Sequence, residues 1–344
     1  MHVVKYVVQQ LHTDHNWINI MHTGGGDGFS CFIAPNGARA RCEHGLNTIR
    51  HVVRSMGLVV NTEKEEMGQT LIFLGTRLSS IAKNGTACSV GLTEKRRQYV
   101  AEQCQIMEHT STIQVSKLMS FAGLLIFCAQ VMFGAKLYLR SAFALIGSRN
   151  RRSMVRLSEQ FIMDCAWWRT MVTQMGECGT LLQRRFVSSR FASWDASLTW
   201  GIGGFFDGKY FSVPWEHYTS GRHNNDVAPI PGSASWHINY MEAFACFIFL
   251  TRFGRFMRGY TVICHTDSTT VKAWLTTMWG PTHVIPLLKR IHLMMLRFDI
   301  RFEVHWLSSK NNILSDLLSR GEMRAFFVAL AEYMRANDSG GLSQ

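Results

Sequence analysis

The first half of the chain is dominated by apolar positions at helical spacing. In residues 39–57 apolar side chains recur three and four positions apart, which predicts an amphipathic helix that ends at Gly57. The same spacing predicts helices over four later segments: 94–107, 113–128, 131–146 and 154–175. Between these regions, short apolar runs are typical of strands around a turn, at 58–61, 70–75 and 76–78. Residues 1–35 show only a glycine-rich turn at 22–28 and an apolar run at 29–34.

The pattern changes near residue 187. Three strand-like runs separated by glycine-rich turns predict an antiparallel meander, at 191–196, 199–206 and 210–213. Helices and strands then alternate, with helices predicted at 239–253, 269–278, 282–298, 312–319 and 322–336, and strands at 260–266 and 300–306. Strands followed by alternating helices and strands predict an α/β domain with a mixed sheet flanked by helices.

The composition and net charge indicate which class of partner the protein could bind. The 344 residues suffice for two domains, and 47% hydrophobic with 17% charged residues is a globular composition. The net charge of +12 favours a polyanionic partner, because basic side chains set against phosphates release condensed counterions. A generically basic protein would carry the same charge, so charge alone does not decide between them.

The cysteines and the apolar runs indicate in which cellular compartment the protein is expected. The nine cysteines form no CxxC pair and no Cys/His cluster at zinc-ligand spacing, which argues for reduced, mostly buried thiols. The N-terminus lacks the pattern of a secretory signal. The most apolar stretch, 121–135, contains Gln130 and is shorter than the roughly 20 residues of a membrane span. We therefore expect an intracellular protein, cytoplasmic or nuclear, that is not secreted and has no membrane partner.

Four acidic residues stand in apolar surroundings in the C-terminal half. Asp195 lies inside an apolar strand, Glu242 heads an apolar helix, Asp267 ends a strand and Asp316 lies near a helix start. Each has a simpler reading: Asp267 could cap a helix, Glu242 could favour a first helical turn, and Asp316 could pair with Arg320. Four acids in apolar surroundings, in the order strand, helix, strand end and helix, are harder to explain by four unrelated roles. Acids converging from different elements are what two divalent cations require for phosphodiester hydrolysis.

The contexts of these acids resemble a known family, the ribonuclease H domains of retroelement polyproteins. The similarity is carried by Trp194–Ser197, Glu242–Ala245, Thr266–Ser268 and, most specifically, Asn312–Arg320, and it covers about residues 190–320. The last motif departs from the family only at Ser315, where Ala is usual.

One family feature is missing from the loop before the last motif. The loop 307–311 lacks the histidine with which many cellular enzymes assist product release, and retroelement versions often lack it too. His305 is near in sequence but lies on a predicted strand, so it is a weak substitute.

The resemblance continues upstream with weaker motifs. Gly57–Lys64 and Phe73–Gly75 are similar to the late palm motifs of reverse transcriptases, while Leu118–Gly123 and Phe133–Lys136 look like the thumb and connection of DIRS-like retroelement polymerases. The resemblance implies a partial reverse-transcriptase palm at 1–92, a helical thumb and connection at 93–186, an RNase H-like domain at 187–321, and a C-terminal helix and tail at 322–344.

The polymerase half lacks its own carboxylate set. The Tyr-x-Asp-Asp turn of reverse transcriptases would fall near residues 25–29, where Asp27 remains and Gly28 replaces the second acid. The early palm aspartate would lie upstream of residue 1. We therefore expect no reverse-transcriptase activity and treat Asp27 as a degenerate polymerase position. This half would instead clamp duplex nucleic acid with five basic residues: Lys95, Arg96, Arg97, Lys136 and Arg140. The alternative is that these charges only form the solvated face of a helix.

The resulting hypothesis is a magnesium-dependent endonuclease that cuts the RNA strand of RNA–DNA hybrids. Two Mg²⁺ ions, with Mn²⁺ as a substitute, would lie beside Asp195 and Asp267, with Glu242 on the scissile side and Asp316 completing one coordination shell. Three residues are weak candidates for contacts to the 2′-hydroxyl groups of the RNA strand: Ser197, Asn239 and Ser268. A non-catalytic nucleic-acid-binding or scaffold protein derived from a retroelement is the alternative, and a tRNA- or junction-directed nuclease is not excluded. The sequence leaves the host and the oligomeric state open.

Overall fold

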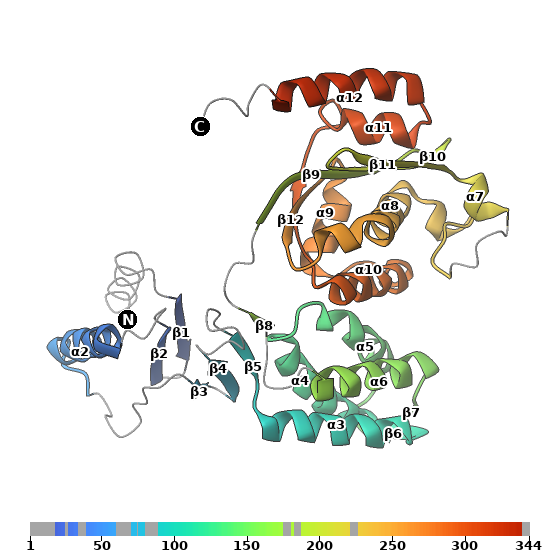
Figure 1. The fold of residues 1–344 in the computed structure, drawn as a ribbon. Coiled ribbons are helices and arrows are strands. Elements are labelled where there is room, and N and C mark those ends of the chain that lie inside the picture. The colour runs from blue at the N-terminus through green and yellow to red at the C-terminus, as the bar shows by residue number, and fades with distance from the viewer. Residues whose placement is uncertain are drawn as a thin grey trace. The chain divides into compact units, whose positions relative to one another are not determined.

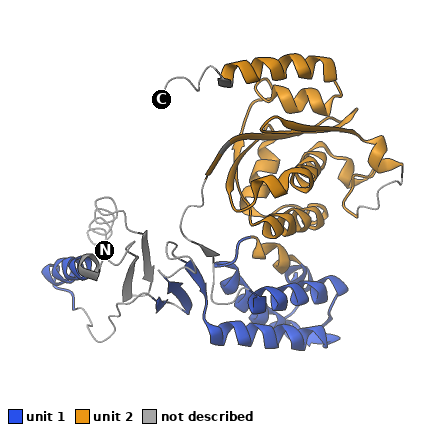
Figure 2. Cartoon of the chain, in the orientation of Figure 1, with its two compact units in different colours: residues 1–133, 141–183 blue, residues 134–140, 184–344 orange. Residues whose placement is uncertain are grey.

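The chain forms two compact units. The computed structural model describes residues 18–24, 27–33, 39–59, 70–73, 75–79, 89–174, 180–181, 187–220 and 226–338. One unit comprises residues 1–133 and 141–183, and the other comprises residues 134–140 and 184–344 (Figure 2). Among the described helices, none combines the length and the apolar character that crossing a membrane requires.

The first unit begins with strands and one helix. β1 (Ile18–Gly24) and β2 (Asp27–Ile33) pair antiparallel, and α2 (Arg39–Ser55) confirms the first predicted helix. An antiparallel sheet has the order β3-β4-β5-β8, with β3 (Thr70–Phe73), β4 (Thr76–Ser79), β5 (Ser89–Leu92) and β8 (Thr180–Leu181).

Three strand expectations in this region need correction. β2 starts two residues before the apolar run at 29–34, and β1, β5 and β8 are not predicted from the sequence. β1 and β2 also occupy most of the turn expected over 22–28. The strand expected at 58–61 is wrong for its described residues, Leu58 and Val59, which are irregular. Val59 is 96% exposed, and an apolar run without a ladder partner or a buried face does not hold a strand.

Helices make up the rest of the first unit. α3 (Glu94–Glu108), α4 (Val115–Ala129) and α6 (Glu159–Gln174) match three predicted helices, and α5 (Arg140–Ile146) follows part of a fourth. Thr93 caps α3 by accepting a hydrogen bond from the Arg96 amide. The side chains between these helices are almost fully buried, among them Val100, Leu118, Phe121, Phe161 and Trp168.

Two predicted helix starts are instead short strands, and one predicted helix is broken. β6 (Thr112–Gln114) and β7 (Met154–Arg156) form a ladder in which Ile113 and Val155 pair and are buried. The helix expected over 131–146 consists of a 3₁₀ segment, η2 (Ala135–Leu139), followed by α5. Gly134 breaks it because its φ is +73° and a Cβ there would overlap the ring of His292.

The second unit is built on a five-stranded sheet. Its order is β11-β10-β9-β12-β13, with β9 (Val187–Ala196), β10 (Gly201–Phe206), β11 (Lys209–Pro214), β12 (Thr261–Thr266) and β13 (Arg301–Trp306). The first three form an antiparallel meander, and β9, β12 and β13 run parallel, which confirms the predicted mixed sheet. Asp207 and Gly208 turn the β10–β11 hairpin with φ values of +48° and +80°, the conformation that matches the strand twist.

Helices cover both faces of this sheet. Figure 1 shows α8 (Ile238–Phe253), α9 (Thr269–Thr277) and α10 (Ile285–Phe298) on one side, and α11 (Ile313–Ser319) and α12 (Met323–Asp338) on the other. The short α7 (Glu216–Thr219) follows β11. The side chains agree: Trp194 packs against Phe249 of α8, whereas Phe205 packs against Leu318 and Phe326.

Gly203 of β10 sets how closely α11 approaches the sheet. A Cβ at this position would overlap Leu318 and would lie 2.5 Å from the Ser319 amide nitrogen. Gly203 is the register partner of Asp195 on β9. The missing side chain therefore lets the last turn of α11 lie directly against the strand that carries Asp195.

Candidate active site

Asp195 is a buried carboxylate near the end of β9. It is 4% exposed, although Asp is poorly suited to strand interiors. Its Oδ2 accepts a hydrogen bond from the hydroxyl of Ser319, the last residue of α11. Because Trp194 points to α8 on the other face, strand alternation directs Asp195 to the α11 side.

Glu242 reaches the same strand end from α8. It is also 4% exposed, and its Oε1 accepts a hydrogen bond of 3.2 Å from the Ala196 amide. Among the described residues its other oxygen, Oε2, has no hydrogen-bond partner. Glu242 is outside the first helical turn, so the simple reading as an acid that favours a helix N-terminus does not describe its role.

Asp267 follows the end of β12, where the main chain and the side chain are both held. Its Oδ2 accepts a hydrogen bond of 2.6 Å from Ser309, and its carbonyl oxygen accepts one of 2.9 Å from Trp306 Nε1. The helix cap that Asp267 could have formed is instead Ser268, whose hydroxyl accepts a hydrogen bond from the Val271 amide. The Asp267 side chain is thus free of a capping role.

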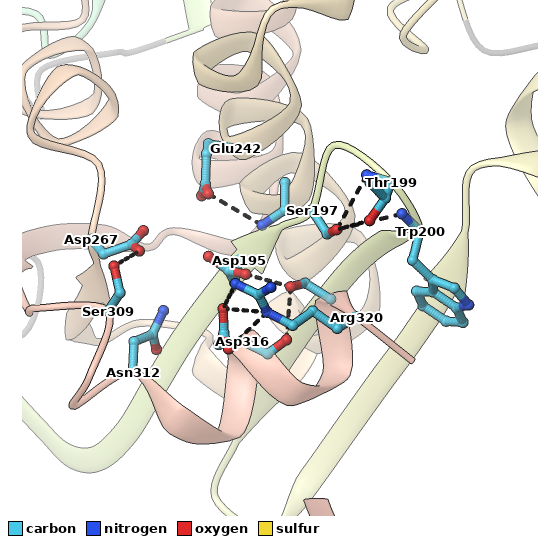
Figure 3. A network of polar contacts seen from close by, with 12 residues as sticks. Asp195, Ser197, Thr199, Trp200, Glu242, Asp267, Ser309, Asn312, Asp316 and Arg320 are labelled. Carbon is cyan, nitrogen blue, oxygen red and sulfur yellow. Dashed lines mark hydrogen bonds and ion pairs between the residues drawn. The ribbon is translucent and has the colours of Figure 1, made fainter. Parts of the chain in front are cut away.

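These three acids form one cluster. Asp195, Glu242 and Asp267 each offer a carboxylate oxygen, and the three oxygens lie within 4.8 Å of one another (Figure 3). Burial, together with the charges of Asp267 and Asp316, raises the pKa of Asp195 to about 7, although the hydrogen bond from Ser319 opposes the rise. Burial also raises the pKa of Glu242 well above its usual range. Such a cluster needs protons or cations to offset its charge.

Asp316 lies beside this cluster with a counterion of its own. Arg320, which follows the last residue of α11, donates from Nε to both carboxylate oxygens at 2.9 Å and approaches Oδ1 with a second nitrogen at 2.8 Å. This is the i,i+4 pair that the sequence also allowed. The structure brings carboxylate oxygens of the first three acids within 4.8 Å of one another. The fourth acid, Asp316, lies close enough for its charge to raise the pKa of Asp195.

The donor set of the cluster fits a hard divalent cation. All three converging ligands are carboxylates, and the described residues add no cysteine or histidine to the group. Mg²⁺ and Mn²⁺ prefer such oxygen ligands, whereas Zn²⁺ sites are usually built from thiolate and imidazole. The buried, unpartnered Oε2 of Glu242 is a further oxygen that a bound cation would satisfy.

The expected nucleic-acid contacts have local partners in the structure. Ser197 accepts hydrogen bonds from the amides of Thr199 and Trp200 and so holds the β9–β10 turn. Ser268 caps α9 and donates to Asn239 Oδ1 at 3.4 Å. These three residues therefore lie near the acids, but each already has a structural contact.

The basic residues expected to clamp a duplex divide between the two units. Lys95, Arg96 and Arg97 form the first turn of α3, where Arg96 covers the Phe127 ring and Arg97 pairs with Glu94. The other two belong to the second unit, where Lys136 is exposed and Arg140 covers the Trp279 ring.

Asp27 is described only through its backbone. It begins β2 and pairs in register with Gly24 of β1. Its side chain, and the glycines at 25 and 26, lie outside the described residues. The degenerate polymerase turn expected there stays a prediction.

Sequence reasoning missed the hydroxyl groups that hold the carboxylates. Ser319 was recognised only as part of the Asn312–Arg320 motif, and Ser309 only as part of a loop without histidine. Serine is common in loops and at helix ends, so neither residue type carried a signal by itself. Both partners come from distant segments, since 124 residues separate Ser319 from Asp195 and 42 separate Ser309 from Asp267.

Comparison with known proteins gives little further information. No family model matches the chain. No curated protein matches it either. Among solved structures it is similar to a foamy viral protease–reverse transcriptase in complex with double-stranded DNA, with a TM-score of 0.39 and 12% identity over 88% of this chain and 48% of that one. The chain thus spans about half the length of that protein, and at this TM-score the likeness does not establish a common fold.

Proposed function

We propose that this chain is a divalent-cation-dependent nuclease of the ribonuclease H type that cleaves the RNA strand of RNA–DNA hybrids. The observation that carries the proposal is the convergence of Asp195, Glu242 and Asp267, which come from a strand, a helix and a strand end. The mixed sheet with helices on both faces and the Asn312–Arg320 motif fit the same class. The retroelement origin, the DIRS-like relationship and the division into palm, thumb and nuclease domains are parts of this proposal.

The protein's own residues provide the framework for cation-assisted hydrolysis. Two bound Mg²⁺ ions would supply an activated water and stabilise the leaving oxygen. Asp195 and Asp267 would hold the cations, and Glu242 Oε2 would offer a further buried oxygen from the α8 side. Ser319 and Ser309 orient the first two carboxylates through hydrogen bonds. Fixed ligands lose little conformational entropy when the cations bind, which is the reason for such supporting contacts.

A non-catalytic nucleic-acid-binding protein is the second candidate, and one observation favours it. Both oxygens of Asp316 are paired with Arg320, so the fourth acid is not free to complete a coordination shell. An exposed ion pair contributes only about 0–1 kcal/mol, so cation binding could displace it. The two candidates therefore differ in whether cation binding displaces Arg320 from Asp316.

Cleavage of an end-labelled RNA–DNA hybrid decides between them. We expect wild type to cut the RNA strand in Mg²⁺ and to be inactive in EDTA, and Asp195→Asn and Asp267→Asn to lose at least about a hundredfold in rate because each removes a cation ligand. Asp207→Asn is the matched control, since it removes an exposed aspartate from the β10–β11 turn. Tight hybrid binding without Mg²⁺-dependent cutting by wild type would establish the second candidate instead.

The polymerase half is tested on a primed RNA template. The proposal includes no DNA synthesis, because Asp27 stands alone where a pair of aspartates is needed. Extension of the primer by wild type would show that this half retains a functional site.

A further inference from the structure

Asn312 has an unusual role for an asparagine at a helix start. It precedes α11 and is 1% exposed, and Figure 3 places it among Ser309, Asp267 and Asp316. Asparagine at this N-cap position normally accepts a hydrogen bond from an amide of the first turn. Here the side chain makes no capping hydrogen bond. Its amide nitrogen is directed toward the strand that carries Asp195.

The two ends of this amide differ in what they contact. Nδ2 donates to the Trp194 carbonyl at 3.4 Å, whereas Oδ1 is buried and has no hydrogen-bond partner among the described residues. Turning the amide over would set Oδ1 against the Trp194 oxygen, two acceptors facing each other, so the orientation is fixed by its donor. A buried oxygen without a donor is destabilising, and a ligand that supplies a donor would relieve this.

We propose that Asn312 Oδ1 accepts a hydrogen bond from a water molecule of a divalent cation held by Asp195, Glu242 and Asp267. The inference rests on the proposed metal centre and makes Asn312 a positioning residue of it. Mg²⁺ dehydrates reluctantly and keeps several waters, and their protons need acceptors. Asp316, the neighbouring acceptor on α11, has both oxygens paired with Arg320. Among the described residues, Asn312 Oδ1 is a buried neutral oxygen that still lacks a donor and could receive such a proton.

The experiment is calorimetric titration of the full chain with Mg²⁺ and with Mn²⁺. Asn312→Ala removes the acceptor and should weaken cation affinity by about 10–100-fold, the usual effect of losing an outer-shell partner. Asn312→Asp keeps an oxygen but cannot donate to Trp194, and it should bind at least as tightly as wild type. Ser315→Ala is the matched control: Ser315 is equally buried on α11, but its hydrogen bond of 2.5 Å is to Ser193. Thermal unfolding in EDTA shows which variants are folded.

Each result bears on the inference. Weak binding by both Asn312→Ala and Asn312→Asp would show that the bond to Trp194 matters, and would overturn the acceptor role, since the added charge of Asp can only favour a cation. Wild-type affinity in Asn312→Ala, or an equal loss in Ser315→Ala, would overturn it too. If Asn312→Ala does not fold, Asn312→Asp against wild type still decides. Absence of any cation binding by wild type is a different result, because it removes the proposed function together with this inference.

Discussion

At the residue scale, the site is defined by how each acid is held. Asp195 is held by Ser319, Glu242 by the Ala196 amide, Asp267 by Ser309 and Asp316 by Arg320. Three of these donors are neutral and orient a carboxylate without neutralising it. Burial raises the pKa of the Asp195 carboxyl, so at neutral pH the cluster holds protons that a cation would replace. Protons and cations thus compete for the same oxygens.

This competition predicts a pH dependence of stability. Without divalent cations, folded Asp195 titrates near pH 7, while in the unfolded chain an aspartate titrates near its ordinary value of about 4. Between these values the folded state holds a proton that the unfolded state has lost, so stability falls as the pH rises through this window. Asp195→Asn removes that penalty and should raise the free energy of unfolding in EDTA by on the order of 2 kcal/mol at pH 8, with little change at pH 4.

Urea unfolding in EDTA at the two pH values measures this effect. Glu332→Gln removes an acid from an exposed position of α12 and should change stability little at either pH. Saturating Mg²⁺ should reverse the order at pH 8, because only wild type gains binding energy. Equal destabilisation by Asp195→Asn at both pH values would show that Asp195 is held in its charged form by the protein alone.

At the element scale, the contact between α11 and β10 positions Ser319, which holds Asp195. Gly203→Ala would place a methyl group against Leu318 and the Ser319 amide, so α11 must move outward. Overpacking of this kind costs about 1–3 kcal/mol. The movement would also separate Ser319 from Asp195, and we expect cation affinity to fall by about tenfold or more as that support is lost. Chemical unfolding and calorimetric titration measure the two effects.

Gly123→Ala provides the contrast for this prediction. Gly123 lies within α4, and a Cβ there would meet no atom within 4 Å. The substitution should stabilise the protein by about 0.5–1 kcal/mol through helix propensity and leave cation affinity unchanged. Wild-type affinity and stability in Gly203→Ala would mean that α11 adapts without moving Ser319.

The elements also show how far the sequence could be read. Apolar spacing located α10, which buries one face at a helical period, and a nearly unbroken apolar run located α8. It did not reveal the break at Gly134, which depends on the ring of His292 far along the chain. In the same way, apolar contexts and one motif identified the acids, whereas their hydrogen-bond partners depend on which loops and helix ends the fold brings together.

At the scale of the whole molecule, the three clustered carboxylates all belong to one compact unit. Asp195, Glu242 and Asp267 lie in the unit of residues 134–140 and 184–344, and the helices α3, α4 and α6 belong to the other. A ligand that binds only the folded state stabilises it by RT ln(1 + [L]/Kd), about 2.7 kcal/mol at a hundredfold excess over Kd. That stabilisation acts on the unit whose unfolding releases the ligand.

Scanning calorimetry should therefore show two transitions, of which Mg²⁺ raises one. For a unit of this size, a few kcal/mol corresponds to an increase in Tm of about 5–10 °C. Hydrogen exchange would assign it, with added protection in peptides of α8 and α11 and none in α3 or α6. Asp267→Asn should abolish the increase in Tm while leaving the other transition in place. A single transition raised as a whole would show that the units unfold cooperatively, and protection in α3 would place a cation site outside the carboxylate cluster.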